Sequence, residues 1–147
     1  MTYPFSELIN ALGEIPTETH PRRVQMKSRD FYWYSPILKA GLENVTADIL
    51  VTPQTEDDIL RVLSVAHELE IPVTPRGAGT GNYGQAMPLA GGILLDLGKM
   101  TRIRSISGDR AIVEPGVILH HLEVAAREHG RELRMFPSTV ETASVGG

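Results

Sequence analysis

Residues 76–84 read Arg-Gly-Ala-Gly-Thr-Gly-Asn-Tyr-Gly and directly follow the short apolar run at 71–75. Glycine adopts positive φ at no steric cost and carries no Cβ, so a loop with four glycines in eight residues can turn several backbone N–H groups toward one point. A concave set of N–H donors binds an anion, most commonly a phosphate or pyrophosphate. The alternative is a flexible glycine-rich turn, which four glycines directly after a strand disfavour. The segment therefore predicts a phosphate-binding glycine loop.

Gly79, Gly81 and Gly84 also satisfy the G-x-G-x-x-G spacing of dinucleotide-binding folds. That motif requires a helix that opens at the third glycine and an acidic residue about 20 positions further on. Residues 85–92 contain a proline and end in a glycine pair, which a helix does not tolerate, and the next carboxylate, Asp96, ends a strand-like run. A Gly-Lys-Ser/Thr ending is missing as well. The sequence thus argues against a Rossmann NAD site and against a P-loop.

Composition narrows the class of protein further. The 147 residues suffice for one domain with a real core, and 41% hydrophobic against 22% charged residues exclude a disordered chain. A net charge of −4 argues against a nucleic-acid or anionic-membrane surface. Without cysteine there are no disulfides, iron–sulfur clusters or cysteinyl cofactor links, and the five histidines show no metal-ligand spacing. Neither a secretory signal pattern nor a run of about 18 apolar residues occurs, so we expect a cytoplasmic protein without a membrane span.

Hydrophobic periodicity predicts four helices and several short strands. The helices are expected over 5–12, from Pro36 to Gly41, from Thr55 to before Pro72, and over 118–129. The strands are expected at 48–52, at Val73, and at 92–96, 104–106, 111–113 and 134–136. The first two strands enclose a helix, which implies a parallel pair with a right-handed crossover. The strands at 104–106 and 111–113 are joined by a Gly-Asp turn and should pair antiparallel.

Two segments in the first part of the chain, residues 14–29 and 31–34, carry no regular hydrophobic periodicity. Residues 14–29, with the basic residues Arg22, Arg23, Lys27 and Arg29, read as a solvated surface segment. The aromatic run at 31–34 is expected to pack in the core or at an interface, with a stacking platform for a ring as the alternative. We therefore divide the chain into a helical and aromatic lead-in at 1–44 and a binding domain at 45–147. The predicted fold class is α+β, with a small parallel β-α-β subdomain followed by a mixed or antiparallel sheet subdomain with helices.

Motifs in the ranges 75–81, 91–97, 113–117, 137–138 and 143–147 occur in a familiar order. Together they resemble the FAD-binding domain of the vanillyl-alcohol oxidase/p-cresol methylhydroxylase (PCMH-type) superfamily. Within it, they are most similar to the branch of glycolate oxidase and D-lactate dehydrogenase subunits. The resemblance extends from about Val45 to the last residue.

The resemblance implies two α+β subdomains with FAD between them. The glycine loop would hold the pyrophosphate through backbone N–H groups, the Glu-Pro-Gly segment would lie near the adenine, and the Ser-Val-Gly-Gly segment would contact the ribityl chain and flavin. The candidate cofactor-binding residues are Pro75, Arg76, Gly77, Ala78, Gly79, Thr80, Gly81, Asn82, Pro115, Gly116, Pro137, Ser138, Ser144, Val145, Gly146 and Gly147. Arg76 would either offset phosphate charge or brace the loop through a carboxylate such as Asp96, and bracing is preferred.

Relatives that attach FAD covalently place a histidine in the glycine loop, where this chain has Thr80, and some add a cysteine. We therefore expect non-covalent FAD. The family continues past its second glycine motif into a substrate domain that supplies the catalytic base, so the chain reads as incomplete at its C-terminus and no residue in it is assigned as that base.

The resemblance implies the N-terminal part of an FAD-dependent oxidoreductase acting on CH–OH groups, with a 2-hydroxy acid such as glycolate or D-lactate bound through a missing C-terminal domain. The isolated chain would then be inactive. The alternative is a non-catalytic FAD- or nucleotide-binding module or an enzyme remnant. No nucleic-acid partner is expected, and homo-oligomerisation is left open.

Overall fold

The computed structural model describes residues 3–146, and its first sheet has four strands in the order β1-β2-β4-β3. Their bounds are β1 (Thr17–Glu18), β2 (Ile49–Val51), β3 (Val73–Arg76) and β4 (Ile93–Asp96). β2 and β3 each pair parallel with β4, whereas β1 pairs antiparallel with β2 at the edge. The parallel arrangement was predicted, but β4 separates β2 from β3. Every residue of β4 is buried, and a strand buried on both faces belongs in the middle of a parallel sheet.

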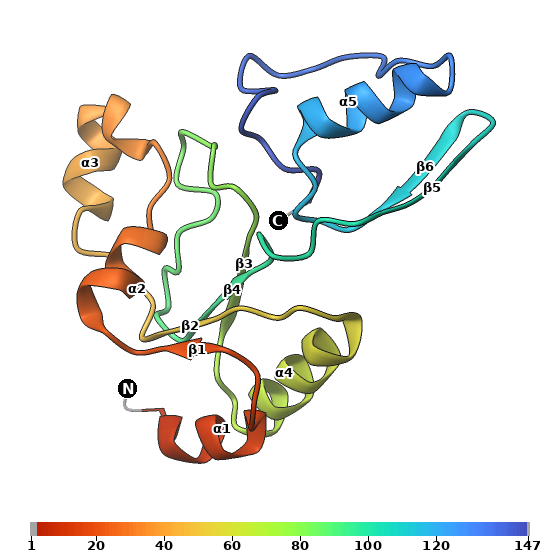
Figure 1. Ribbon diagram of the computed structural model, residues 1–147. Helices are drawn as coiled ribbons and strands as arrows, with labels where there is room; N and C mark the ends of the chain where they lie inside the picture. The colour runs from red at the N-terminus through yellow and green to blue at the C-terminus, as the bar shows by residue number, and fades with distance from the viewer. Residues whose placement is uncertain (1–2, 147) are drawn as a thin grey trace.

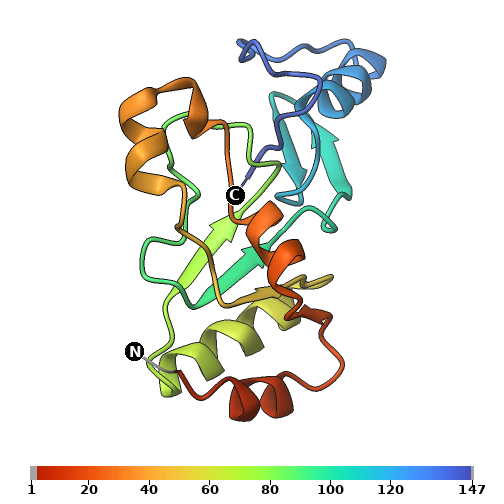
Figure 2. The same ribbon diagram turned by 90° about the vertical axis from the view of Figure 1, so that its left-hand side faces the viewer.

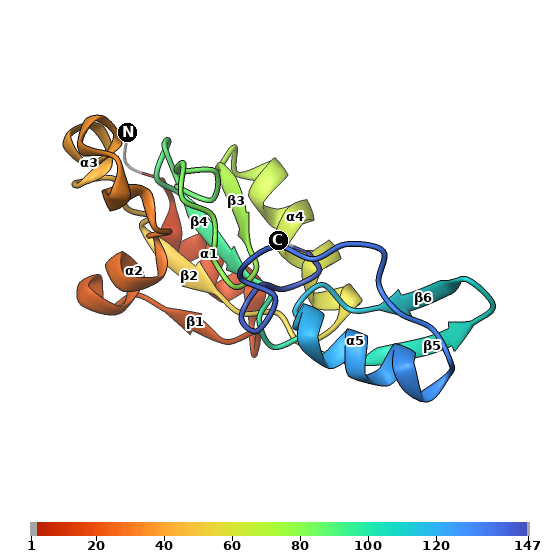
Figure 3. The same cartoon turned by 90° about the horizontal axis from the view of Figure 1, so that it is seen from above.

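Helices cover both faces of this sheet, which lies between α2 and α4 when seen from above (Figure 3). On one face, α1 (Phe5–Leu12) and α4 (Glu56–Glu68) pack their apolar side chains against Ile49 and Ile93. On the other face, Val24 of α2 (Pro21–Lys27) packs against Leu50 and Leu94. Neighbouring residues of a strand point to opposite faces, so the continuous apolar runs of β2 and β4 supply both cores.

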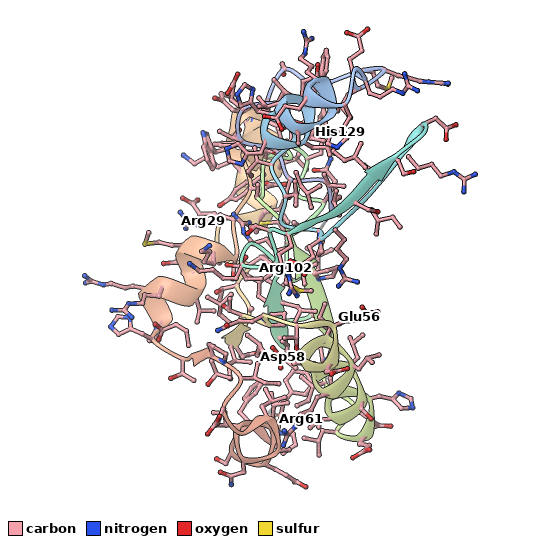
Figure 4. The ribbon with its side chains drawn as sticks, turned by 45° about the vertical axis from the view of Figure 1, so that its right-hand side comes forward. Arg29, Glu56, Asp58, Arg61, Arg102 and His129 are labelled. Carbon is pink, nitrogen blue, oxygen red and sulfur yellow. The ribbon has the colours of Figure 1, made fainter. Side chains whose placement is uncertain are left out.

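Helix α4 begins and is held as its sequence predicts. Thr55 caps it by accepting a hydrogen bond from the Asp58 N–H at 3.1 Å, and Asp58 Oδ2 accepts one from the Thr55 N–H at 3.0 Å. Arg61, labelled in Figure 4, joins α4 to α1 because its Nε donates to the Ala11 carbonyl at 2.8 Å. Within residues 3–146, no helix has the length and apolar character needed to cross a membrane.

The lead-in contains more regular structure than the sequence indicated. Residues 14–29 were predicted as a surface segment, but they form β1 and α2. Val24 is the one buried residue among the seven of α2. The segment therefore lacks the repeated apolar residues that indicate an amphipathic helix. Further on, the 3-10 helix η1 (Tyr32–Tyr34) and α3 (Pro36–Leu42) stand beside the green glycine loop (Figure 2). Of the aromatic run, Tyr32 is buried, whereas Phe31, Trp33 and Tyr34 are exposed.

The second part of the fold is a hairpin with one helix (Figure 1). Its elements are β5 (Ile103–Ser107), β6 (Arg110–Val113) and α5 (Leu119–Glu128). β5 and β6 pair antiparallel, as predicted, and Gly108 takes a φ of 61° in the turn between them. The strand predicted at 134–136 is wrong, because these residues form no strand and no ladder partner lies beside them in the described part of the chain. Met135 and Phe136 are exposed instead of lying in a sheet.

A buried carboxylate lies at the base of the hairpin. Glu114 is 2% exposed, and it accepts hydrogen bonds from the Arg102 backbone N–H at 2.9 Å and from Arg102 Nε at 2.7 Å. Arg104 lies 3.7 Å from the same carboxylate and 3.5 Å from Glu56 at the start of α4, so charges connect both parts of the fold (Arg102 and Glu56 in Figure 4). The Arg102 N–H, and then the charges of Arg102 and Arg104, lower the pKa of Glu114 although burial opposes them.

This lowered pKa predicts a pH-dependent contribution to stability. Because the pKa of folded Glu114 lies below its ordinary value of 4.5, its contribution is present above pH 4.5 and is lost as the pH falls through the folded pKa. Glu114→Gln should therefore reduce the free energy of unfolding at neutral pH, and its difference from the wild type should shrink on acidification. Urea titrations at several pH values would measure this. Glu128→Gln, at an exposed glutamate of α5, is the control, and an equal pH trend in both variants would contradict the role of Glu114.

Candidate cofactor site

The glycine loop leaves the sheet at the carboxyl end of β3, because Arg76 is the last residue of that strand. Asp96 ends the neighbouring strand β4 in register with Arg76. In open parallel sheets, ligands bind beyond the carboxyl ends of the strands. Figure 2 shows the end of the described chain meeting the loop at this edge. The fold thus brings the two predicted glycine segments to the edge where parallel sheets bind ligands.

The start of the loop interlocks with residues 144–146. The Ala78 N–H donates to Ser144 Oγ at 2.9 Å, and Ser144 Oγ donates in turn to the Gly146 carbonyl at 2.8 Å. A Cβ on Gly77 would lie 2.0 Å from the Gly146 carbonyl oxygen and 2.2 Å from Ser144 Oγ. The two backbones therefore meet at a distance that no side chain at position 77 would allow.

The Pro115–Gly116 segment completes the same contact. The Gly146 N–H donates to the Pro115 carbonyl at 2.8 Å, and a Cβ on Gly146 would lie 2.7 Å from the Pro115 Cβ. Gly116 packs against the backbone after β4, where its own Cβ would lie 2.5 Å from the Leu97 carbonyl oxygen. Three motifs that are distant in the sequence consequently form one backbone surface.

The middle of the loop offers unused donors. Among residues 3–146, the N–H groups of Gly79, Thr80, Gly81 and Asn82 donate no hydrogen bond. Gly79 has a φ of 68°, a conformation that glycine adopts without strain. Four consecutive free N–H groups in a glycine loop fit the phosphate groups of a dinucleotide.

Arg76 donates a hydrogen bond to the lead-in and not to Asp96, the carboxylate suggested by its sequence position. It is 8% exposed, and its Nη1 donates to the Arg29 carbonyl at 2.6 Å. The direct partner of Asp96 is Lys27, whose Nζ lies 2.7 Å from it. Burial lowers the pKa of Arg76, and the charges of Asp96 and Asp30 oppose that shift.

A hollow of about 400 Å³ lies between the lead-in and the loop. Its lining includes Arg29, Phe31 and Trp33 on one side and Arg76 and Gly79 on the other. The volume is within the range of small-molecule sites. The sequence placed Arg29 in a surface segment, and for Phe31 it predicted packing in the core or at an interface with a stacking platform for a ring as the alternative.

Several of the predicted cofactor-binding residues take no part in the contact between the glycine loop and residues 144–146. Pro137 and Ser138 are exposed in the turn after residue 136, and no hydrogen bond described for residues 3–146 connects them to the glycine loop. Pro75 is exposed on β3, and Val145 is exposed although its N–H donates to the Val117 carbonyl at 2.8 Å. Gly147 lies outside the described residues.

The loop also differs from a Rossmann site, as predicted. Residues 85–92 form turns and irregular backbone after Gly84, and no helix opens there. The Asp96 carboxylate accepts hydrogen bonds from Lys27 Nζ and, at 3.0 Å, from the Gly98 N–H. The acidic residue and the helix N-terminus of an NAD site are therefore both missing at this position.

Comparison with solved structures identifies the class of fold. The chain superposes over 95% of its length on p-cresol methylhydroxylase, with a TM-score of 0.75, 21% identity and 28% of that chain covered. Alkyldihydroxyacetonephosphate synthase is similar over 100% of this chain and 31% of its own, with a TM-score of 0.81 and 19% identity. These likenesses confirm the predicted PCMH-type α+β fold.

Sequence comparison then identifies the family. Residues 47–147 match the family described as FAD binding domain, so this chain belongs to that family. The glycolate oxidase subunit GlcD of Escherichia coli is 37% identical over 101 residues, which are 67% of this chain and 20% of the relative. A D-lactate dehydrogenase of Archaeoglobus fulgidus is 40% identical over 100 residues, 67% of this chain and 22% of the relative. The chain spans about a fifth of these relatives, and the predicted cofactor, FAD, is confirmed.

The backbone contact at Gly77 generates a stability prediction. Gly77→Ala should lower the free energy of unfolding by about 1–3 kcal/mol, because its Cβ must push the loop away from residues 144–146. Gly41→Ala is the matched control, since nothing lies within 4 Å of its Cβ and alanine favours the helix by about 0.5–1 kcal/mol. Denaturant titration of both variants measures the difference. Equal stability of the two variants would show that the contact is not close.

Proposed function

We propose that this chain supplies the FAD-binding part of an oxidoreductase that oxidises a 2-hydroxy acid such as glycolate or D-lactate. The observation that carries the proposal is the convergence of residues 77–78, 115–116 and 144–146 beside four unused N–H donors. The substrate class is supported by the names of the relatives, a glycolate oxidase subunit and a D-lactate dehydrogenase. Because these relatives are much longer than the chain, the activity of the whole protein is part of the proposal.

In this proposal, the N–H groups of residues 79–82 bind the pyrophosphate of FAD. Pro115 and Gly116 lie on the adenine side, and residues 144–146, together with Ser138, face the ribityl chain and the flavin. When bound, FAD accepts a hydride from the substrate carbon. The chain's own contribution is to hold the cofactor in one geometry, since rigid backbone donors need no rearrangement when the ligand arrives.

The rival proposal is a module that binds FAD without catalysis. The two are separated by the full product of the gene, purified with FAD and mixed with an artificial electron acceptor. The oxidoreductase should reduce the dye with glycolate or D-lactate and not with the corresponding carboxylic acids that lack the hydroxyl group. Tight FAD binding without dye reduction by any 2-hydroxy acid would favour the rival.

The role of the loop is tested at Gly79. Gly79→Val should weaken FAD binding severely, because each charge-assisted hydrogen bond that is lost costs about 1.5–3 kcal/mol. Gly108→Val is the control for backbone strain, because Gly79 and Gly108 have φ values of 68° and 61°; a side chain at Gly79 also meets the Arg76 guanidinium, whereas nothing lies within 4 Å at Gly108. Titration of FAD against each folded variant measures the dissociation constant. Equal affinity in the two variants would contradict the loop assignment.

The mode of attachment is tested by acid. With Thr80 in the loop and no cysteine in the chain, FAD should be bound non-covalently. Precipitation of the holoprotein with acid should then release yellow flavin into the supernatant. Flavin that stays in the washed pellet would show a covalent bond.

A further inference from the structure

The lead-in holds the far end of the glycine loop. The Gly84 N–H donates to Asp30 Oδ2 at 2.8 Å, and the Phe31 N–H donates to the Gly81 carbonyl at 2.8 Å. The other oxygen of Asp30 accepts a hydrogen bond from the Tyr32 N–H at 2.9 Å, which orients the carboxylate. Asp30 and Phe31 precede the region 47–147 that matches the FAD-binding family.

We propose that Asp30 is a positioning residue of the cofactor site, through which the lead-in holds the glycine loop ready for FAD. This inference rests on the proposed function. It extends the site beyond the family region, to a segment whose sequence suggested only solvated charges and aromatic packing.

The burial and the hydrogen bonds of Asp30 support a positioning role. Its residue exposure is 2%, and each carboxylate oxygen accepts a backbone N–H. Transfer of a carboxylate from water into the protein interior costs free energy unless hydrogen bonds and a countercharge stabilise it. The Arg76 guanidinium lies within electrostatic reach, since the charges of Asp96 and Asp30 oppose the lowering of its pKa by burial.

The loop is therefore held on both sides of its free donors. Ser144 holds it at Ala78, and the lead-in holds it at Gly81 and Gly84. Gly84 takes a φ of 79°, a conformation that a mobile glycine would leave readily. Fixing such a loop before the ligand arrives removes an entropic cost of binding. Asp30 thus affects FAD affinity through the loop that it holds.

The test is Asp30→Asn in the full product of the gene. Tyr32 and Gly84 donate to different oxygens of Asp30, and asparagine replaces one of these oxygens with an NH2 donor, so one of the two N–H groups loses its acceptor. The dissociation constant for FAD should rise by about tenfold or more. Asp48→Asn is the control for the change of side chain beside another positive-φ glycine, because the exposed Asp48 accepts the N–H of Gly92 through Oδ2 at 2.6 Å next to the opposite end of β4. Its dissociation constant should stay within about twofold of the wild type.

Hydrogen exchange of the FAD-free wild type supplies a second readout. The Gly84 amide should be protected before FAD is added, and Asp30→Asn should abolish that protection while Asp48→Asn preserves it. Equal FAD affinity in the two variants, or an unprotected Gly84 amide in the wild type, would overturn the role of Asp30. If Asp30→Asn does not fold, the wild-type exchange decides. A wild type that binds no FAD would instead overturn the proposed function, and this inference with it.

Discussion

The two parts of this fold depend on a contact that glycine alone permits. Gly77 follows the parallel sheet and Gly146 follows α5, and a Cβ on Gly77 would lie 2.0 Å from the carbonyl oxygen of Gly146. Backbones that approach this closely can exchange hydrogen bonds through Ser144 and can present their own N–H groups to a ligand. The same contact therefore joins the two parts of the fold and forms the candidate site.

Buried charges around this contact act on the backbone more than on one another. Glu114 accepts the N–H of Arg102, Asp30 accepts the N–H of Gly84, and Arg76 donates to the carbonyl of Arg29. Such bonds fix loops that have little apolar surface to bury. A loop that offers free donors must be held by other segments, and Asp30 holds the glycine loop at Gly84.

Local sequence predicted the elements that have their own period or punctuation. Thr55 and the acidic first turn signalled the start of α4, and the Gly-Asp turn at residues 108–109 between two short β-rich runs signalled the hairpin. The strand predicted at 134–136 failed because a β-rich run forms a strand only where a partner accepts its hydrogen bonds. Helix α2 was missed because its contact with the sheet depends on one buried apolar residue, Val24, and a single residue gives no periodicity.

The sequence by itself determined that a glycine loop follows a strand, that no helix follows the loop, and that the order of motifs is that of an FAD-binding domain. The first two properties are local, since they depend on φ freedom and proline, whereas the third is a resemblance to a known family. Only the tertiary structure decided that β4 lies between β2 and β3, that Gly77 meets Gly146, and that Asp30 holds Gly84. Each of these joins residues far apart in the chain, and long-range pairing is set by packing, which no local pattern encodes.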